Sequence, residues 1–320
     1  MNIYDIAKKC NVSIATVSRV INNSDKVSAK TRDKVKKAMK EADYTPNAFA
    51  RGLGLGSMRM IGLLCTDVSD LYYAKAVSLI EKNLRTLGFD TLLCCSGQNI
   101  DDKKKALDII IKKNVDAVVL IGSTFHEMSD NTHIIDAAAK LPVFIVNGDI
   151  SADGVYCVLC DERKAMYNNV EYLAKKGVKE ILYLYDTETF SGKSKLSGIQ
   201  EGIKAFDIKA HIVRTEKDVD VTKTQTAEVI EKNNITGIIA SEDLLAIGAL
   251  KAVNETNKKI SVIGFNNSLI SKVSTPALTS VDNMLDELCP MVSELVSKLL
   301  SGQKIPSRTV LDAKIVKRDT

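Results

Sequence analysis

The sequence of 320 residues is poor in proline and histidine and contains no long apolar run. Its five prolines do not gather into a low-complexity tract. The longest apolar runs, such as 117–121, are far too short to cross a bilayer. The N-terminal stretch "MNIYDIAKKC" lacks the charged start and apolar segment of a signal peptide. We therefore expect a cytoplasmic protein with no membrane partner and, from its length, about two or three domains.

The residue combinations of most enzymes are also missing. The sequence has no G-x-S-x-G motif and no pair of carboxylates with an evident catalytic role, and its three scattered histidines give no triad. Nothing supports a metal site or a cofactor. An enzyme, with a sugar-binding enzyme as the remote case, is therefore the least favoured class.

Seven cysteines in a chain without a signal peptide indicate free thiols in a reducing compartment. Two groups, Cys94–Cys95 and the C-x-x-C of Cys157 and Cys160, lie inside apolar, strand-like runs. A redox C-x-x-C begins a helix, and a structural zinc site needs a second pair of ligands. We therefore expect these cysteines to be buried small hydrophobic residues.

The positive charge is concentrated at the N-terminus. Residues 1–60 hold 12 Lys and Arg against 5 Asp and Glu, whereas residues 61–320 hold 32 against 35. A basic module on a nearly neutral body is typical of a nucleic-acid reader with a separate partner domain. A solvated, lysine-rich helix face around 30–40 would give the same numbers, so charge alone leaves both interpretations open.

Three short helical patterns fill the basic module. The first spans Ile3–Cys10, and the second spans about Ser13–Asn22 after the turn "NVS", in which Asn11 tolerates a left-handed backbone and Ser13 can cap the next helix. A third pattern spans about 29–42 behind a serine cap. Two helices joined by a three-residue turn and braced by a third predict a helix-turn-helix.

The second helix of such a motif enters the major groove with its first residues at base edges. Arg19 has the donors to grip guanine at two atoms, and Ala15 is small enough to touch a thymine methyl. Spacing leaves Ile14 open between base contact and core, because it lies at helical intervals from the apolar residues that follow. Three polar side chains suit phosphates: Thr16, Ser18 and Asn22.

The stretches "IYDIAKKCNVSIATVSRVIN" and "VSAKTRDKVKKAMKEADYTPNAFARGL" closely resemble the headpiece of the lactose-repressor family of bacterial transcription factors. The resemblance covers essentially the first 53 residues. It implies that Ile14, Ala15 and Arg19 lie where the family reads operator bases. One departure is Asn11, where many members have Gly, and Asn tolerates the same backbone.

The next segment, "NAFARGLGLGSMRMIGLL", contains a G-x-G-x-G. A phosphate-binding glycine loop follows a strand and opens a helix, whereas here a helical pattern comes first and a strand pattern second. The resemblance implies instead a hinge helix that pairs across a dimer and inserts Leu53 between base pairs of the minor groove. A helix this short, with glycines beside the wedge, is marginal in water, so we expect it to order on DNA. The hinge residues implied along the groove are Asn47, Ala50, Arg51 and Leu53.

From residue 60 onward, short apolar runs alternate with amphipathic helical stretches. "MIGLLCTD", "DTLLCC", "DAVVLIG" and "PVFIVN" form one series, and "EILYLYD", "AHIVRT", "GIIASED" and "ISVIGFNN" form another after "YCVLCDE". This alternation predicts parallel sheets with helices on both faces, and two series predict two lobes with a cleft between them. The resemblance implies the same body, since the family's effector domain resembles periplasmic sugar-binding proteins.

The predicted fold is thus an all-α helix-turn-helix headpiece with a hinge helix, joined to an α/β body of two doubly wound parallel-sheet lobes like a type I periplasmic binding protein. The chain is expected to cross between lobes three times, the last time just before a final strand "RTVLDAKIVKRD". The expected boundaries are 1–46 for the headpiece, 47–58 for hinge and linker, and 59–320 for the effector domain, with an N-lobe at about 59–160 and 287–310 and a C-lobe at about 161–286 and 311–320.

Ligands of such sheets bind outside the carboxyl ends of the strands. The loops there carry amide and carboxylate groups that can fork onto adjacent hydroxyls, and aromatic faces that can cover C–H surfaces, as suits a sugar. The three aromatic side chains could equally pack the lobes together. The candidate effector-binding residues are Asp67, Leu71, Tyr72, Tyr73, Ser123, Asn147, Phe190, Lys195, Glu242, Asn266 and Asn283, with Phe190 and Lys195 expected in a loop over 186–195.

Four of these positions depart from the family pattern. Lys195 stands where most members have Arg, and Lys cannot make the flat bidentate fork of Arg. Asn266 lacks the carboxylate of the usual G-[FY]-D-[DN], while Glu242 stands where Asn is common and Asn147 where Asp is common. The effector therefore stays open between a modified sugar and another polar ligand.

The leading interpretation is a ligand-responsive DNA-binding dimer, usually a repressor. Its expected partners are double-stranded operator DNA, a small carbohydrate-like effector and a second copy of the chain, because the sequence ends at Thr320 without the heptad tail of tetrameric members. "IATVSRVIN" and "YTPNAFARGL" also resemble catabolite-control members, which respond to a phosphorylated carrier protein, so that partner is the alternative signal. A sensor that never touches DNA would leave the basic module unexplained.

Overall fold

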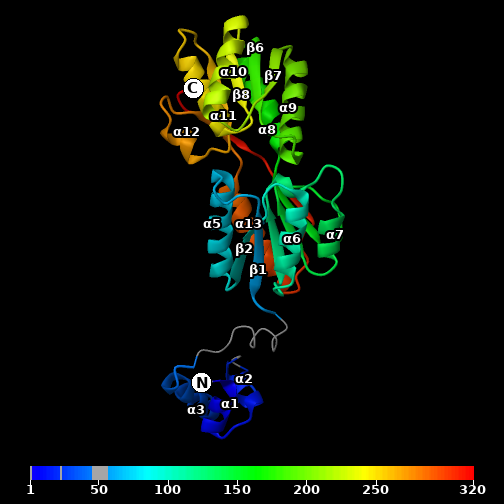
Figure 1. Cartoon of the computed structure of the whole chain (residues 1–320), viewed down its shortest axis with the longest axis vertical. Coiled ribbons are helices and arrows are strands. Elements are labelled where there is room, and N and C mark those ends of the chain that lie inside the picture. Colours follow the sequence, from blue (N-terminus) through cyan, green and yellow to red (C-terminus); the bar gives the residue numbers. More distant parts are fainter. Residues whose placement is uncertain (1, 22–23, 45–56) are drawn as a thin grey trace.

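The computed structural model describes residues 2–21, 24–44 and 57–320. The N-terminal part is a small bundle of three helices, α1 (Ile3–Cys10), α2 (Ile14–Ile21) and α3 (Ala29–Glu41) (Figure 1). One apolar face of each helix meets the others in a common core: Ile6, Ala7, Cys10, Val17, Val20, Val35 and Ala38. The helix-turn-helix expected from the sequence is therefore present, and only Asn22 of its second helix lies outside the described residues.

The turn between α1 and α2 uses the residues that its sequence predicts. Asn11 ends α1 in the left-handed conformation, with φ 50° and ψ 51°, which Asn adopts more readily than most residues. The side chain of Ser13 then accepts a hydrogen bond of 3.1 Å from the backbone N–H of Thr16 and so caps α2. Ser28 caps α3 in the same way through the N–H of Thr31.

The first lobe is built on a six-stranded sheet in which every pairing is parallel. Its strand order is β11-β5-β4-β3-β1-β2. The strands are β1 (Met60–Cys65), β2 (Asp90–Cys95), β3 (Ala117–Ile121), β4 (Val143–Val146), β5 (Val155–Cys160) and β11 (Arg308–Leu311). Helices α5 (Leu71–Thr86) and α13 (Leu285–Leu300) cover one face, and α6 (Ile100–Ile111) and α7 (Thr132–Ala138) cover the other.

The second lobe repeats this arrangement with the strand order β12-β10-β9-β8-β6-β7. Its strands are β6 (Glu180–Tyr185), β7 (Lys209–Arg214), β8 (Gly237–Ala240), β9 (Ser261–Phe265), β10 (Thr279–Asp282) and the antiparallel β12 (Lys314–Val316). Helices α8 (Glu162–Lys175) and α9 (Phe190–Phe206) cover one face, α10 (Val219–Lys232) and α11 (Asp243–Asn254) the other, and the short α12 (Leu269–Val273) lies beside α11. The predicted fold class is confirmed for the helical headpiece and the two-lobed body, and the hinge helix expected within 47–58 falls largely on residues outside the described part of the chain.

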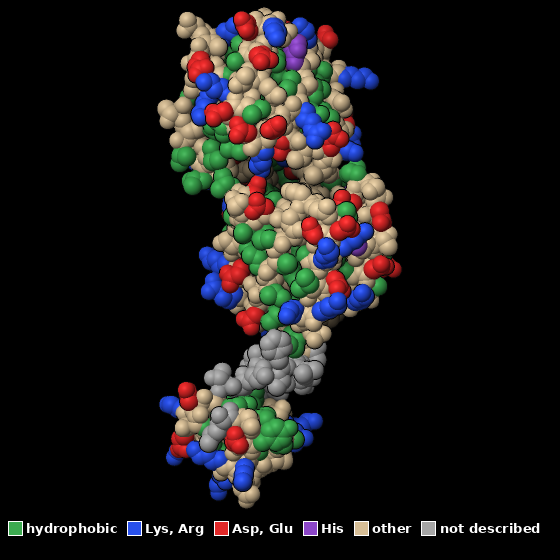
Figure 2. Space-filling model, in the orientation of Figure 1, with side chains coloured by type: hydrophobic (Ala, Val, Ile, Leu, Met, Phe, Trp, Pro, Cys, Tyr) green, Lys and Arg blue, Asp and Glu red, His purple; other side chains and the backbone are tan. Residues whose placement is uncertain are grey.

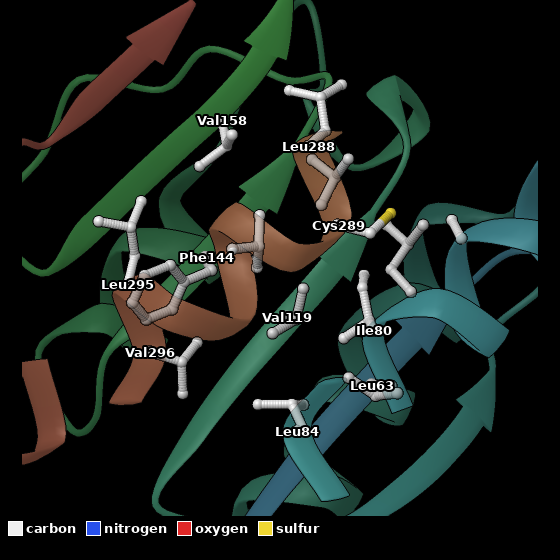
Figure 3. Packing of buried hydrophobic residues seen from close by; sticks show 14 of the residues in the cluster. Leu63, Ile80, Leu84, Val119, Phe144, Val158, Leu288, Cys289, Leu295 and Val296 are labelled. Carbon is white, nitrogen blue, oxygen red and sulfur yellow. The ribbon is translucent and has the colours of Figure 1, made fainter. Parts of the chain in front are cut away.

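Figure 3 shows how the core of the first lobe closes around α13. Leu288, Leu295 and Val296 recur at helical spacing and pack with Phe144 and Val158 of the sheet. Each is buried, so truncating Leu288 to Ala would cost about 2–5 kcal/mol of stability. Within the described residues no helix is long and apolar enough to pass through a membrane.

The chain passes between the lobes three times. β5 ends at Cys160 in the first sheet and α8 begins at Glu162 on the second. The return occurs at 283–284, slightly before the boundary expected at 286/287, because α13 already begins at Leu285. The final strand expected over "RTVLDAKIVKRD" is wrong as a single element, since Leu311 ends β11 in the first sheet and Lys314 begins β12 in the second.

The cysteine prediction holds for one group and is wrong for the other. Cys157 and Cys160 are buried in β5, at the interior of the first sheet. Cys94 is only half-buried and Cys95 is exposed, because β2 lies at the edge of the sheet, where no neighbouring strand of the described chain shields one side of it.

Candidate functional site

Helix α2 presents the side chains that the sequence singles out for bases on its exposed face. Spacing left Ile14 open between base contact and the core. In the structure it is 42% exposed and lies outside the headpiece core. Ala15 and Arg19 are also exposed, while Val17 and Val20 point into the bundle. Thr16 and Ser18 are half-buried. The remaining candidates, Asn22, Asn47, Ala50, Arg51 and Leu53, lie outside the described residues.

The same helical bundle carries exposed basic side chains on α3. Lys34, Lys36, Lys37 and Lys40 are exposed along α3, and Figure 2 shows Lys and Arg side chains spread over the described surface of the headpiece. Such a surface attracts a polyanion through counterion release, whatever its base sequence.

A cavity of about 310 Å³ lies between the lobes, at the carboxyl ends of the strands of both sheets. This volume falls at the lower end of the roughly 300–1,000 Å³ of small-molecule sites. We call it the cleft. Of the candidate effector residues, eight line it: Asp67, Tyr72, Tyr73, Ser123, Asn147, Lys195, Glu242 and Asn266.

Three candidate residues lie elsewhere. Leu71 starts α5 and points into a neighbouring groove. Asn283 is 1% exposed and donates a hydrogen bond of 2.9 Å to the side-chain oxygen of Asn266. Phe190 stacks on His126 of the first lobe, with ring centroids 4.6 Å apart, so it packs the lobes together, as one of the two interpretations of the aromatic side chains held.

The wall from the first lobe is ordered by its own hydrogen bonds. Asp70 caps α5 by accepting from the backbone N–H of Tyr72 at 2.8 Å. The Tyr72 hydroxyl accepts from the amide of Asn147, whose oxygen accepts from the N–H of Cys160. Tyr73 fits closely over Gly122, where a Cβ would lie 2.5 Å from its ring. The cleft therefore has a rigid tyrosine and amide floor on this side.

Part of the wall from the second lobe is the first turn and a half of α9, where a loop was expected. The loop expected over 186–195 ends at Thr189, which caps α9 by accepting from the N–H of Gly192. The helix can start this early because Gly192 leaves room for the carbonyl of Thr187, which a Cβ would meet at 2.1 Å. Phe190 and Lys195 therefore occupy fixed helical positions.

Lys195 is almost fully buried at the base of the cleft. Its ammonium group donates 3.0 Å to the carbonyl of Ser241, lies 3.4 Å from the carboxylate of Glu162, and lies 4.0 Å from the ring centre of Phe265. A buried cation needs such partners to offset its lost hydration. Much of its binding capacity is thus already used by the protein.

Lys217 bridges the two lobes across the cleft. It follows β7 of the second lobe, and its ammonium lies 2.7 Å from Asp70 of the first lobe and 2.7 Å from Glu242 of its own. Burial works to lower the pKa of Lys217, but Glu242 and Asp70 outweigh it and raise that pKa. Burial raises the pKa of Glu242 to about 7, although Lys217 opposes the shift. A hydrogen bond of 3.2 Å from Ser123 to Thr189 joins the lobes on the opposite side.

The charged residues that the sequence analysis missed are Asp70, Glu162, Asp186 and Lys217, all of which line the cleft. Each follows the carboxyl end of a strand, although for Glu162 that strand, β5, belongs to the other lobe, so the strand-end rule used for the other candidates contained the signal. Asp70 also caps α5, so it has a structural role besides its place in the cleft.

A second hollow of about 460 Å³ opens beside the cleft, between α5 and α12. We call it the groove. Leu71, Leu269, Ile270 and Leu285 are among its lining residues. Leu269 is 67% exposed and Leu71 48%, and Figure 2 shows hydrophobic side chains at the rim between the lobes, over α12.

Comparison with known proteins agrees with this architecture. Residues 2–47 match the family of bacterial regulatory proteins, lacI family, and residues 170–320 match the periplasmic binding protein-like domain. An HTH-type transcriptional regulator of Lachnoclostridium phytofermentans is 41% identical over 100% of this chain and 99% of its own length. Catabolite control protein A of Staphylococcus epidermidis is 25% identical over 97% and 96%. The lac repressor dimer bound to operator and the anti-inducer ONPF superposes with a TM-score of 0.87 at 22% identity, over 99% and 98%.

A helix-turn-helix headpiece on a two-lobed α/β body defines a DNA-binding transcriptional regulator. The full-length match to a regulator at 41% identity, together with the headpiece family, makes the assignment specific. The chain belongs to the lacI family of bacterial regulatory proteins. It is repressor-like, and the relatives named above are regulators of transcription and not enzymes.

Proposed function

We propose that this chain is a homodimeric repressor whose operator affinity is set by a small, polar, sugar-like effector bound in the cleft. The observation that carries the proposal is the position of the cleft, whose walls come from both lobes. A ligand there contacts both walls, so its affinity depends on how the lobes are arranged. A ligand with different affinities for two arrangements shifts the population between them.

The DNA end of the mechanism rests on α2 and on the hinge. Ile14, Ala15 and Arg19 read bases in the major groove from the exposed face of α2. Two hinge helices, one from each protomer, meet in the minor groove, where Leu53 acts as the wedge. Unstacking a base step costs a few kcal/mol, which the added contact with a bent duplex offsets. Because the cost of unstacking and the gain from DNA contact nearly cancel, small rearrangements of the lobes can decide whether the hinges engage DNA.

The proposed dimer uses the face that carries the groove. Leu71, Leu269 and Val273 are 48%, 67% and 69% exposed, and monomeric proteins rarely leave apolar side chains gathered this way in water. The second copy of the chain is the occupant that we propose. Leu269→Asp should convert the dimer into monomers in analytical ultracentrifugation while circular dichroism stays unchanged. A variant that remains fully dimeric would remove this face from the interface.

The central experiment measures operator binding with and without ligand. The operator is first selected from random duplexes with the purified protein, and binding is then followed by fluorescence anisotropy. Arg19→Ala should weaken binding by about 1–3 kcal/mol and relax the preference at one base position. Lys40→Ala removes the same charge from exposed α3 and serves as the matched control. Equal losses on all sequences for both variants would contradict base reading by Arg19.

A catabolite-control regulator is the second candidate. The similarity to catabolite control protein A over 97% of the chain favours it, and so does the engagement of Lys195 by Glu162 and Ser241, which leaves less of this side chain for a sugar. In that case a phosphorylated carrier protein would raise operator affinity in the anisotropy assay. Calorimetric heat from a small polar ligand, with a change in operator affinity, favours the first candidate.

A further inference from the structure

The cleft carries an excess of negative charge. Lys195 and Lys217 are its two cationic side chains. Five carboxylates line it against them: Asp67, Asp70, Glu162, Asp186 and Glu242.

The two lysines do not satisfy all of the carboxylates. Lys195 pairs with Glu162, and Lys217 is shared between Asp70 and Glu242. The remaining two carboxylates are Asp67, after β1, and Asp186, after β6. Among the described residues neither takes part in an ion pair, although Asp67 accepts hydrogen bonds from Ser69 and Asp186 accepts one from Ser241.

One oxygen of the Glu242 carboxylate also lacks a donor within the described residues. Its Oε2 contacts Lys217, whereas its Oε1 is buried without a hydrogen-bond partner in the described part of the chain. A buried acceptor left unpaired costs about 1–3 kcal/mol. Burial also raises the pKa of this carboxyl to about 7 in spite of the adjacent lysine.

A ligand can supply what the protein does not. In the described residues no group of three or more His, Cys, Asp or Glu side chains is arranged to hold a metal ion. An ammonium group on an organic ligand has three donors and a full charge, and it fits between carboxylates as the ammonium of Lys217 already does. An anionic ligand would add repulsion to a site that is already short of cations.

We infer that the cleft selects a polar ligand that carries a positively charged amine, such as an amino sugar, and that Glu242 and Asp186 receive this amine. The inference rests on the proposed function of the cleft as the effector site and names the chemical class of the effector. The hydroxyl groups of such a ligand meet the amide of Asn266 and the hydroxyl-rich wall formed by Ser123 and Thr189.

Matched ligand pairs test the inference on the full-length protein. Glucosamine, galactosamine and mannosamine are titrated by calorimetry at neutral pH beside the parent hexoses, which keep nearly the same shape without the charge, and beside the N-acetyl derivatives, which keep the nitrogen but lose its charge and add an acetyl group. At least one amine should bind ten-fold or more tightly than both of its neutral counterparts. If a neutral sugar binds as well as its amine, or if no amine binds, the inference is overturned.

Two variants at opposite ends of one helix sharpen the result. Glu242 precedes α11 inside the cleft, and Glu255 follows the same helix with 63% of its side chain exposed. Glu242→Gln should reduce the preference for the amine at least five-fold, and Glu255→Gln should leave it unchanged. An undiminished preference in Glu242→Gln would overturn its assigned role.

The outcomes also separate this inference from the proposed function. If a neutral sugar binds as well as its amine and changes operator affinity, the proposed function stands and the requirement for an amine is refuted. Failure of every sugar, charged or neutral, to bind or to alter operator affinity counts against both.

Discussion

Replacing Glu242 by Gln should make the protein more stable at alkaline pH and leave its stability nearly unchanged in acid. The pKa of this carboxyl is about 7 in the folded protein, against an ordinary value of 4.5, because burial disfavours the ionised form. A raised carboxyl pKa means that the folded state binds the proton more tightly than the unfolded chain. Its contribution to stability is therefore present below about pH 4.5 and is lost as the pH rises through about 7.

The magnitude follows from the size of the shift. A difference of about 2.5 units at 1.36 kcal/mol each sets a ceiling of about 3 kcal/mol. Since 14% of the side chain remains exposed, we expect a difference of about 1–3 kcal/mol between the variant and the native protein at about pH 8.5. Gln keeps the size of the protonated acid, so the difference should vanish near pH 4.5.

Urea unfolding followed by circular dichroism at several pH values measures this difference directly. Glu255→Gln provides the control, because this carboxylate lies at the other end of α11 with 63% of its side chain exposed. Parallel pH profiles for the native protein and Glu242→Gln would refute the reasoning, since they would mean that the carboxyl titrates alike in the folded and unfolded states.

Three further changes test the signalling path. Leu53→Ala should leave the fold intact and reduce the DNA bend, and an unchanged bend in a cyclisation or energy-transfer assay would count against the wedge. Lys195→Ala should abolish the ligand response while operator affinity stays within about two-fold; a normal response would exclude Lys195 from the site. Operator affinity should fall steeply with salt, by roughly 0.9 in log K per log salt for each phosphate contacted, and a flat profile would argue against the basic headpiece as the contact surface.

Local sequence patterns predicted most of the fold because the decisive interactions are local. The limits of α1 agree with the prediction, since its apolar spacing lies within the helix and its capping residues, Asn2 and Asn11, directly flank it. The early start of α9 was missed, because it depends on the close approach of Gly192 to the carbonyl of Thr187, a contact that a pattern does not reveal. The break of the last strand pattern into two separate strands was missed for the same kind of reason.

The candidate site was predicted where it depends on topology and missed where it depends on pairing. Strand ends placed Asn147 and Glu242 in the cleft without knowledge of the structure. The partnership of Lys217 with Asp70 joins residues from different lobes, and nothing in either local sequence specifies the other. Asn283 follows a strand as well, yet it turns inward to Asn266 and away from the cavity.

The exchange of segments between the lobes has a consequence for biosynthesis. The first sheet receives α13 and β11 from residues 285–311, long after its other strands have left the ribosome. Until then the apolar face that α13 covers, with Phe144 and Val158 at its centre, has no partner helix. The second sheet also waits for its last strand, because β12 is made after β11, so neither sheet is complete until the last part of the chain has been made. A nascent chain stalled before residue 285 should be a preferred client of chaperones and proteases.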